Sequence, residues 1–274
     1  MTYSTIKLAG WKIKLADDFP SGFESVILSE VQFPNGHRSS FEKLTSSKFA
    51  SVLKFSVLFR SKVYNLILKR YLNRNFSDIL KNLISTRADR AFKAGRMLRE
   101  KGFSTPPAVA LCQKSFAGFI TADFLITTEI QDCLPIYQLF IKLADSEKRE
   151  LMEQFGQTVG RMHNQGFSHG DLRLGNVLVK PVVSLSNPKQ DGKYDFIFLD
   201  NERTKKFNKL PMRLRIKNLV QINMLRESLT DADKTHFLTS YLAQQQPPLD
   251  KELLTKEVES KTAERLAAKG IRTV

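Results

Sequence analysis

Residues 169–176 read His-Gly-Asp-Leu-Arg-Leu-Gly-Asn and set an aspartate, Asp171, five positions before an asparagine, Asn176. Phosphoryl transfer needs these two side-chain types on one short loop. A carboxylate orients the acceptor hydroxyl and receives its proton, and an amide oxygen helps to hold a magnesium ion. The residue types and their spacing therefore indicate a phosphotransfer loop, with Asp171 as the catalytic base and Asn176 as a metal ligand.

The loop resembles the protein-kinase catalytic loop, His-Arg-Asp-Leu-x-x-x-Asn, except that Gly170 replaces the arginine. That glycine points toward kinases of small molecules and sugars. Arg173, two residues after Asp171, either places a guanidinium on the transferring phosphoryl group or is an ordinary surface arginine. Glycine, aspartate and asparagine also form plain polar turns. A plain turn does not explain why the loop follows a capped helix and precedes a β-rich stretch.

Two further residues stand in the order that a kinase site requires. Lys69 ends a predicted strand and is followed some twenty residues later by a predicted helix. In such a place an ammonium group can reach the phosphates of a nucleotide. Asp200 follows the apolar run 196–199 and is placed to hold the magnesium ion that bridges the β- and γ-phosphates. The alternatives are a strand-end lysine and a strand-capping aspartate.

The elements that must position these residues change character along the chain. The first half predicts strands at 49–59 and 63–71, a helix at 87–101 and a hairpin that turns at 121–123. The second half predicts a helix at 146–165 capped by Asp145 or Ser146, strands at 177–180 and 194–200, and helices at 216–229, 232–245 and 251–269.

This order predicts an α+β, bilobal protein-kinase-like fold with a β-rich N-lobe and a helical C-lobe. We expect residues 1–44 to be an N-terminal extension packed on the first lobe. Residues 45–131 would form the N-lobe, and residues 132–274 would form the C-lobe.

The formal net charge is +15, with a pI near 9.8, and this favours an anionic partner over a merely solvated surface. We expect that partner to be an anionic sugar, a glycolipid or an anionic membrane surface, and not nucleic acid. The sequence has no run of 18 apolar residues and no secretion signal at its start. A cytoplasmic protein, at most peripheral on the inner membrane, is therefore expected.

A family resemblance extends over roughly residues 45–243. The chain is similar to the lipopolysaccharide kinase family, the Kdo and heptose kinases that phosphorylate the inner core of bacterial lipopolysaccharide. The stretches that carry the resemblance are 66–71, 87–92, 102–107, 124–130, 169–176, 199–203, 217–222 and 237–242.

The resemblance implies an ATP- and Mg²⁺-dependent kinase in which Asp171 is the base, Asn176 and Asp200 hold the metal, and Lys69 anchors the phosphates. It places Glu129 and Ile130 in the hinge that meets adenine. It also places Ser46, Ser47 and Lys48 in the phosphate-covering turn, where no Gly-x-Gly-x-x-Gly stands.

The helical partner of Lys69 is open in the sequence. The middle of the 87–101 helix carries Ala91 and Ala94 instead of a glutamate, so Asp89 is the preferred partner and Glu100 the alternative. Asp89 is equally suited to be a first-turn residue that interacts with the helix dipole.

A basic segment after Asp200 contains Lys205, Lys206, Lys209, Arg213, Arg215 and Lys217. It suits an acceptor sugar that carries carboxylates and phosphates, or a membrane surface. The last helix either docks on the protein or lies on a membrane. The rival functions are a phosphotransferase of the aminoglycoside or choline kinase type and a catalytically inactive scaffold at the membrane surface.

Overall fold

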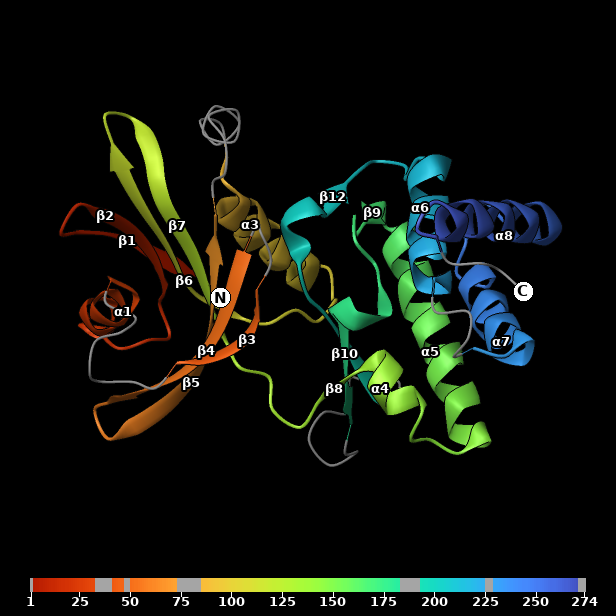
Figure 1. Cartoon of the computed structure of the whole chain (residues 1–274), viewed down its shortest axis with the longest axis horizontal. Coiled ribbons are helices and arrows are strands. Elements are labelled where there is room, and N and C mark those ends of the chain that lie inside the picture. The colour runs from red at the N-terminus through yellow and green to blue at the C-terminus, as the bar shows by residue number, and fades with distance from the viewer. Residues whose placement is uncertain are drawn as a thin grey trace. The chain divides into compact units, whose positions relative to one another are not determined.

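The computed structural model describes residues 2–32, 41–46, 50–72, 85–182, 193–224 and 229–270. The chain divides into two compact units. The first unit contains residues 1–100 and 106–131, and the second contains residues 101–105 and 132–274 (Figure 1). A β-rich unit and a helical unit make an α+β fold, as the sequence predicted.

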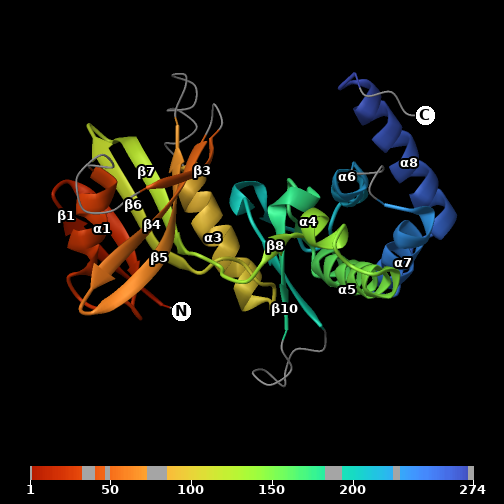
Figure 2. The same ribbon diagram turned by 60° about the horizontal axis from the view of Figure 1, so that its bottom comes forward.

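A seven-stranded antiparallel sheet forms the first unit, in the order β1-β2-β6-β7-β5-β4-β3. Its strands are β1 (Tyr3–Leu8), β2 (Trp11–Ala16), β3 (Glu42–Ser46), β4 (Ala50–Phe59), β5 (Lys62–Tyr71), β6 (Ala108–Phe116) and β7 (Phe119–Thr128). Two helices, α1 (Phe23–Gln32) and α3 (Arg87–Glu100), cover its two faces (Figure 2).

The two faces follow from the alternation of side chains along each strand. On β6, Ala110 and Cys112 belong to the apolar cluster that includes Phe23 of α1. Leu111, between them, belongs to the cluster that includes Phe92 of α3. The sheet is therefore buried on both sides at its centre, which holds the strand that carries Lys69 in a fixed frame.

Most local predictions for this unit are confirmed. The predicted strands correspond to β4 and β5, and their two-residue turn at Arg60 and Ser61 has positive φ angles of 47° and 62°, as a tight hairpin turn demands. The helix α3 begins after Thr86, whose hydroxyl accepts a hydrogen bond from the Asp89 N–H at 3.2 Å, and it ends before Gly102, where φ is +82°.

The predicted turn at 121–123 is wrong. The hairpin turns at Ala117 and Gly118, with φ of 48° and 82°, and β7 runs on through the predicted turn. Asp123, expected on a surface turn, is instead 3% exposed in β7. Its carboxylate accepts a hydrogen bond from the Ala88 N–H at 3.2 Å, so it satisfies a free backbone donor at the start of α3.

The N-terminal residues contribute strands and a helix to this unit. β2 pairs with β6, and Trp11 is buried and stacks on Phe124 with ring centroids 5.2 Å apart. Phe19 stacks on Phe23 at 5.1 Å. The first 32 residues therefore add two strands to one edge of the sheet and a helix to one of its faces.

Helices dominate the second unit: α4 (Ile136–Phe140), α5 (Asp145–Asn164), α6 (Met212–Asn223), α7 (Asp231–Leu242) and α8 (Lys251–Ala267). Short strands accompany them in two small sheets. One has the order β11 (Tyr194–Phe198), β10 (Val177–Pro181), β8 (Leu134–Pro135), and the other pairs β12 (Lys205–Lys206) with β9 (Phe167–Ser168). Helix α7 packs along α5, and α8 packs against α6 (Figure 1).

Several helix boundaries differ from prediction, among them the starts of α5 and α6 and the end of α7, which lies at Leu242. Neither Asp145 nor Ser146 caps α5; the helix starts at Asp145, and the preceding Ala144 donates its N–H to the Glu147 carboxylate at 3.2 Å. Helix α6 starts at Met212, four residues before the predicted start, because Pro211 supplies an extended residue directly before the first turn.

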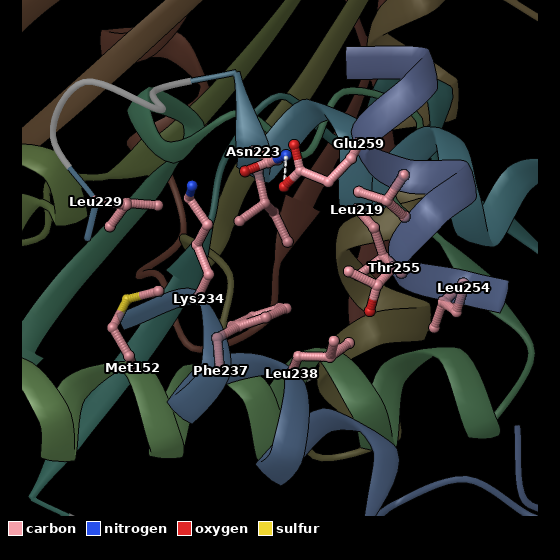
Figure 3. A pocket seen from close by; sticks show the side chains of 12 residues that line it. Met152, Leu219, Asn223, Leu229, Lys234, Phe237, Leu238, Leu254, Thr255 and Glu259 are labelled. Atoms are coloured by element: carbon pink, nitrogen blue, oxygen red, sulfur yellow. Dashed lines mark hydrogen bonds between the residues drawn. The ribbon is translucent and has the colours of Figure 1, made fainter. Parts of the chain in front are cut away.

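An apolar pocket of about 80 Å³ lies among α5, α6, α7 and α8 (Figure 3). Leu219, Phe237 and Leu254 line it, and Asn223 at its edge donates to Glu259 at 3.2 Å. The volume equals that of two or three water molecules. None of the residues that the sequence marks for chemistry lines it, so this pocket is a feature of helix packing.

Candidate active site

The 169–176 loop leaves β9 and enters a 3₁₀ turn, Leu174–Asn176, before β10 begins. Gly170 has a φ of +78°, and a Cβ atom built there would lie 2.7 Å from the Cβ of Arg203 and would also meet the Arg203 carbonyl. A glycine replaces the arginine of protein kinases here because the backbone conformation and the packing exclude any side chain.

Three side chains hold the carboxylate of Asp171. Arg173 donates from Nε to Oδ1 at 2.9 Å and from Nη2 to Oδ2 at 2.8 Å. Asn176 donates from Nδ2 to Oδ2 at 3.2 Å and to the Asp171 carbonyl at 2.9 Å. Gln221 donates from Nε2 to Oδ1 at 3.3 Å. The carboxylate therefore has a defined orientation, and Arg173 lies on it as a bidentate ion pair.

Two amides of α6 anchor the backbone of the loop. Asn218 Oδ1 accepts the His169 N–H at 3.1 Å, and Gln221 Oε1 accepts the Leu172 N–H at 2.9 Å. Neither amide was predicted from the sequence. Their spacing of three residues on a helix was a usable signal, because it places both side chains on one face.

Asn176 and Asp200 stand at the paired ends of β10 and β11. The register Val177↔Phe198 continues into a hydrogen bond from the Leu199 N–H to the Asn176 carbonyl at 2.9 Å. Asp200 follows directly in a left-handed conformation, with φ 55° and ψ 47°. The hairpin thus carries both predicted metal ligands at the same end.

His169 lies two residues before Asp171. Its ring is fully buried, and burial lowers its pKa, whereas the carboxylates of Asp171 and Asp200 act in the opposite direction. Both carboxylates therefore lie close enough to the ring to act on it electrostatically.

The residues present fit a magnesium ion. Asn176 uses its Nδ2 on Asp171, so its Oδ1 is not engaged by a described residue and is a carbonyl-type oxygen ligand. Magnesium typically takes one or two protein oxygens and completes its shell with water and phosphate. The described residues contain no cluster of three or more histidine, cysteine, aspartate or glutamate side chains that could hold a metal.

Lys69 lies in the first unit, on β5, between Val52 of β4 and Leu125 of β7. Its ammonium group lies 5.1 Å from the centroid of the Tyr71 ring. The neighbouring Leu68 is buried, because successive side chains of a strand point to opposite faces of the sheet.

Asp89 has different partners from the one expected. Among the described residues its carboxylate pairs with Lys93 at 2.7 Å and with Lys14 at 3.6 Å, not with Lys69. Burial raises the pKa of Asp89, but the hydrogen bonds from Lys93 and Ser85 outweigh burial, and the pKa is lowered. Lys14 lies on β2, outside residues 45–243 over which the family resemblance extends, so its pairing with Asp89 was not predicted.

The predicted hinge residues follow β7. Glu129 donates its N–H to the Asn65 carbonyl at 2.9 Å, and its carboxylate pairs with Lys54 at 2.6 Å. A cavity of about 310 Å³ in the first unit is lined in part by Glu129, Asn65 and Phe19. Ile130 follows Glu129, just after the end of the strand.

The predicted phosphate-covering turn is described only at its start. Ser46 is the last residue of β3, and Ser47 and Lys48 lie outside the described residues.

The basic segment is partly buried. Lys205 and Lys206 form β12, and Arg213 and Lys217 are exposed on α6. Arg215, predicted to face an acceptor, is instead 9% exposed and donates to the Tyr241 hydroxyl at 2.6 Å. The prediction for Arg215 is wrong because the helix turns this residue toward α7.

Helix α8 is a docked helix. Leu254 and Leu266 are buried, whereas Leu253 is 64% exposed. No helix among the described residues is both long enough and apolar enough to cross a membrane.

A β-rich unit, a helical unit and a loop that fixes an aspartate and an asparagine define a phosphotransferase with a protein-kinase-like fold. The chain belongs to the lipopolysaccharide kinase (Kdo/WaaP) family, whose model matches residues 42–241. A curated relative is the lipopolysaccharide core heptose(I) kinase WaaP of Escherichia coli. It is 27% identical over an alignment of 188 residues that covers 64% of this chain and 69% of that protein.

Solved structures show the same fold. WaaP in complex with acyl carrier protein matches with a TM-score of 0.63 and 20% identity, over 90% of this chain and 97% of that one. The Rio2 kinase of Chaetomium thermophilum, in its ADP/Mg²⁺-phosphoaspartate complex, matches with a TM-score of 0.51 and 15% identity, over 97% and 82% of the two chains.

Proposed function

We propose that this protein transfers the γ-phosphoryl group of ATP to a hydroxyl of a Kdo or heptose residue in the lipopolysaccharide inner core. The observation that carries the proposal is the carboxylate of Asp171, which Arg173, Asn176 and Gln221 orient on a kinase-type loop. The family match and the heptose kinase relative support the choice of acceptor.

Asp171 acts as the base that orients the acceptor hydroxyl and receives its proton. Before substrates bind, the exposed guanidinium of Arg173 neutralises this carboxylate through two hydrogen bonds. The phosphoryl group carries more negative charge than one carboxylate does, so Arg173 exchanges its partner when that group arrives. The exchange leaves Asp171 able to accept the proton and places a cation on the phosphoryl oxygens.

Asn176 and Asp200 hold magnesium through the Asn176 Oδ1 and the Asp200 carboxylate. The bound ion supplies positive charge that offsets the charge on the transferring group. The pairing of β10 with β11 supports this assignment, because it fixes the backbone of both residues at one end of a hairpin.

The first unit binds the nucleotide. In this proposal Lys69 aligns the phosphates, Ser46 and Ser47 belong to the turn that covers them, and the backbone of Glu129 and Ile130 contacts adenine. The placement of Lys69 in the centre of a sheet covered on both faces supports a fixed phosphate anchor.

The acceptor approaches along the basic segment. Lys205, Lys209, Arg213 and Lys217 are exposed and attract the carboxylates and phosphates of an inner-core sugar. The same charge favours a peripheral position on an anionic membrane surface.

Mass spectrometry of the lipopolysaccharide core tests the proposal directly. Deletion of the gene in its host is expected to remove one phosphate from a Kdo or heptose residue, and expression of the wild-type chain restores it. The purified chain with ATP and Mg²⁺ should also phosphorylate core glycolipid from the deletion strain. An unchanged core, together with no transfer in vitro, would refute the proposal.

A further inference from the structure

A set of buried polar side chains lies behind the loop, between α5, α6 and α7. Its members are at most 9% exposed, although each carries a polar or charged group: His163, Arg215, Asn218, Gln221 and Tyr241. Helix α7 packs along α5 (Figure 1), and hydrogen bonds of His163 to Asn218 and of Arg215 to Tyr241 join both helices to α6. Buried polar groups are costly unless they are hydrogen-bonded, so their arrangement needs an explanation.

The orientation of the two amides is fixed by backbone donors. Asn218 Oδ1 accepts the His169 N–H, so Asn218 Nδ2 must be the atom that donates to Gln221 Oε1 at 3.0 Å. Gln221 Oε1 accepts the Leu172 N–H, so Gln221 Nε2 must be the atom that donates to Asp171 Oδ1. Exchanging oxygen and nitrogen in either amide would set two donors against each other.

The tautomer of His163 follows from the same logic. Asn218 Oδ1 only accepts, so His163 Nε2, 3.2 Å away, carries the hydrogen. Burial, with a contribution from the Arg215 charge, lowers the pKa of His163 to about 3, so the ring is neutral and Nδ1 is an acceptor. The Tyr241 hydroxyl, 2.9 Å from Nδ1, therefore donates to it and accepts in turn from Arg215 at 2.6 Å.

We propose that Arg215 is a positioning residue for Asp171 and acts through a chain of hydrogen bonds that all run in one direction. The chain passes from Arg215 to Tyr241, His163, Asn218 and Gln221 and ends on Asp171 Oδ1. This inference rests on the proposed role of Asp171 as the base.

The direction of the chain matters because aligned hydrogen bonds polarise one another. Arg215 makes no ion pair with an acidic side chain among the described residues, and its hydrogen-bond acceptors are the uncharged Tyr241 and Gln245. A buried cation without a counter-ion is expensive, and an apolar side chain would fill the same space at a lower cost. The chain of hydrogen bonds transmits the effect of the Arg215 charge to Asp171, because each hydrogen bond in it points its donor toward the carboxylate that orients the acceptor hydroxyl.

Tyr241→Phe tests the chain, because it removes one hydroxyl and keeps the ring. We expect kcat for phosphoryl transfer to fall about tenfold, the size typical of groups that orient a reactive residue through a hydrogen bond, with KM for ATP unchanged. Tyr3→Phe is the matched control in the first unit. The Tyr3 hydroxyl also accepts from an arginine, Arg99, at 3.2 Å and donates to a carbonyl, that of Ala108, at 3.1 Å. This control should retain wild-type kcat.

A double-mutant cycle separates a chain from independent structural effects. Gln221→Leu breaks the last link, and we expect it to lower kcat at least as much as Tyr241→Phe. If both residues act through one chain, the double variant should be hardly slower than Gln221→Leu alone. Effects on kcat that multiply independently would overturn the proposal.

Amide hydrogen exchange supplies a readout that does not depend on catalysis. The His169 N–H bonds to Asn218 and the Leu172 N–H bonds to Gln221, so both should exchange faster in Tyr241→Phe and at the wild-type rate in Tyr3→Phe. If the wild-type protein transfers no phosphate, the proposed function fails, and the exchange rates still decide whether the chain holds the loop. Unchanged exchange in Tyr241→Phe would overturn the chain in either case.

Discussion

The two units hold their predicted site residues in different ways. In the second unit, Asp171 is oriented by Gln221, fifty positions later in the sequence, and by a buried set of polar side chains behind it. In the first unit, Lys69 is placed by strand pairing with its neighbours, and Asp89 is held by lysine ion pairs. One unit fixes its chemistry through buried hydrogen bonds, and the other through the regular backbone of a sheet.

This difference predicts where substitutions should have the larger effect on activity and stability. A strand position depends on many backbone hydrogen bonds, and no single side chain controls it. A loop position held by a few buried side chains depends on each of them, because an unsatisfied buried donor or acceptor costs about 1–3 kcal/mol. Substitutions in the second unit should therefore change activity and stability together more often than those in the first.

Asp171→Asn should have the largest effect of these variants. It separates the loss of the catalytic base from the loss of the residues that hold it in place. The amide has the same shape but cannot receive the proton, so we expect transfer of phosphate to fall by at least about a thousandfold, as for the loss of an essential base. Initial rates with core glycolipid measure it. Asp195→Asn, the same change on β11 in the same unit, should stay within about twofold of wild type, since Asp195 has no role in this mechanism. A variant at Asp171 with wild-type rates would show that another group is the base.

Gly170→Ala should come next, as a test of backbone support in the second unit. The new Cβ meets the Arg203 backbone and also requires a φ of +78°, so we expect a loss of more than about 3 kcal/mol in the free energy of unfolding. Gly118→Ala is the matched control, because φ is +82° there and no atom lies within 4 Å of the new Cβ. It should lose only about 1–2 kcal/mol, the cost of the left-handed conformation. Equal losses in denaturant titrations would mean that Gly170 is required for its φ angle alone.

His163, one of the two buried histidines of the second unit, should make stability depend on pH. Burial lowers the pKa of His163 from 6.5 to about 3, so between these values the unfolded chain binds a proton that the folded chain does not. Stability is then complete above pH 6.5 and falls as the pH decreases, by about 1.4 kcal/mol per pH unit for one such group. His163→Gln should reduce the slope of unfolding free energy against pH between pH 6.5 and 5 by that amount. An identical slope in the variant would show that His163 is protonated in the fold.

Much of the fold was predictable because local patterns control it. The strands β4 and β5 follow a period of two around a two-residue turn, and α3 runs from a threonine cap to a glycine. The loop was predictable because its chemistry needs fixed residue types at a fixed spacing. These signals act over a few residues and need no knowledge of distant partners.

Two of the failures share one cause, which is contact between segments far apart in the sequence. Arg215 looks like part of an exposed basic segment until α7 supplies Tyr241 as its acceptor. Asp123 looks like a turn residue until α3 presents an unpaired N–H to it. A charged or polar side chain is read as exposed by default, and only the fold shows which of them have buried partners.

Substitution of Asp123 should have the smallest effect of these variants. It tests the difference between the two units directly, because Asp123 makes a buried polar contact in the unit whose site residues are otherwise held by its sheet. The pKa of the Asp123 carboxyl is raised, because burial outweighs the hydrogen bonds from Thr86 and Ala88, which act in the opposite direction. Asp123→Ala removes one acceptor from the start of α3, and the usual cost of losing such a cap is about 1 kcal/mol of unfolding free energy. Chemical denaturation measures the loss. The rate of hydrogen exchange at the Leu172 amide, in the second unit, should not change. A loss of about 3 kcal/mol or more, the size expected for a broken buried polar set, would mean that the first unit too depends on its buried hydrogen bonds.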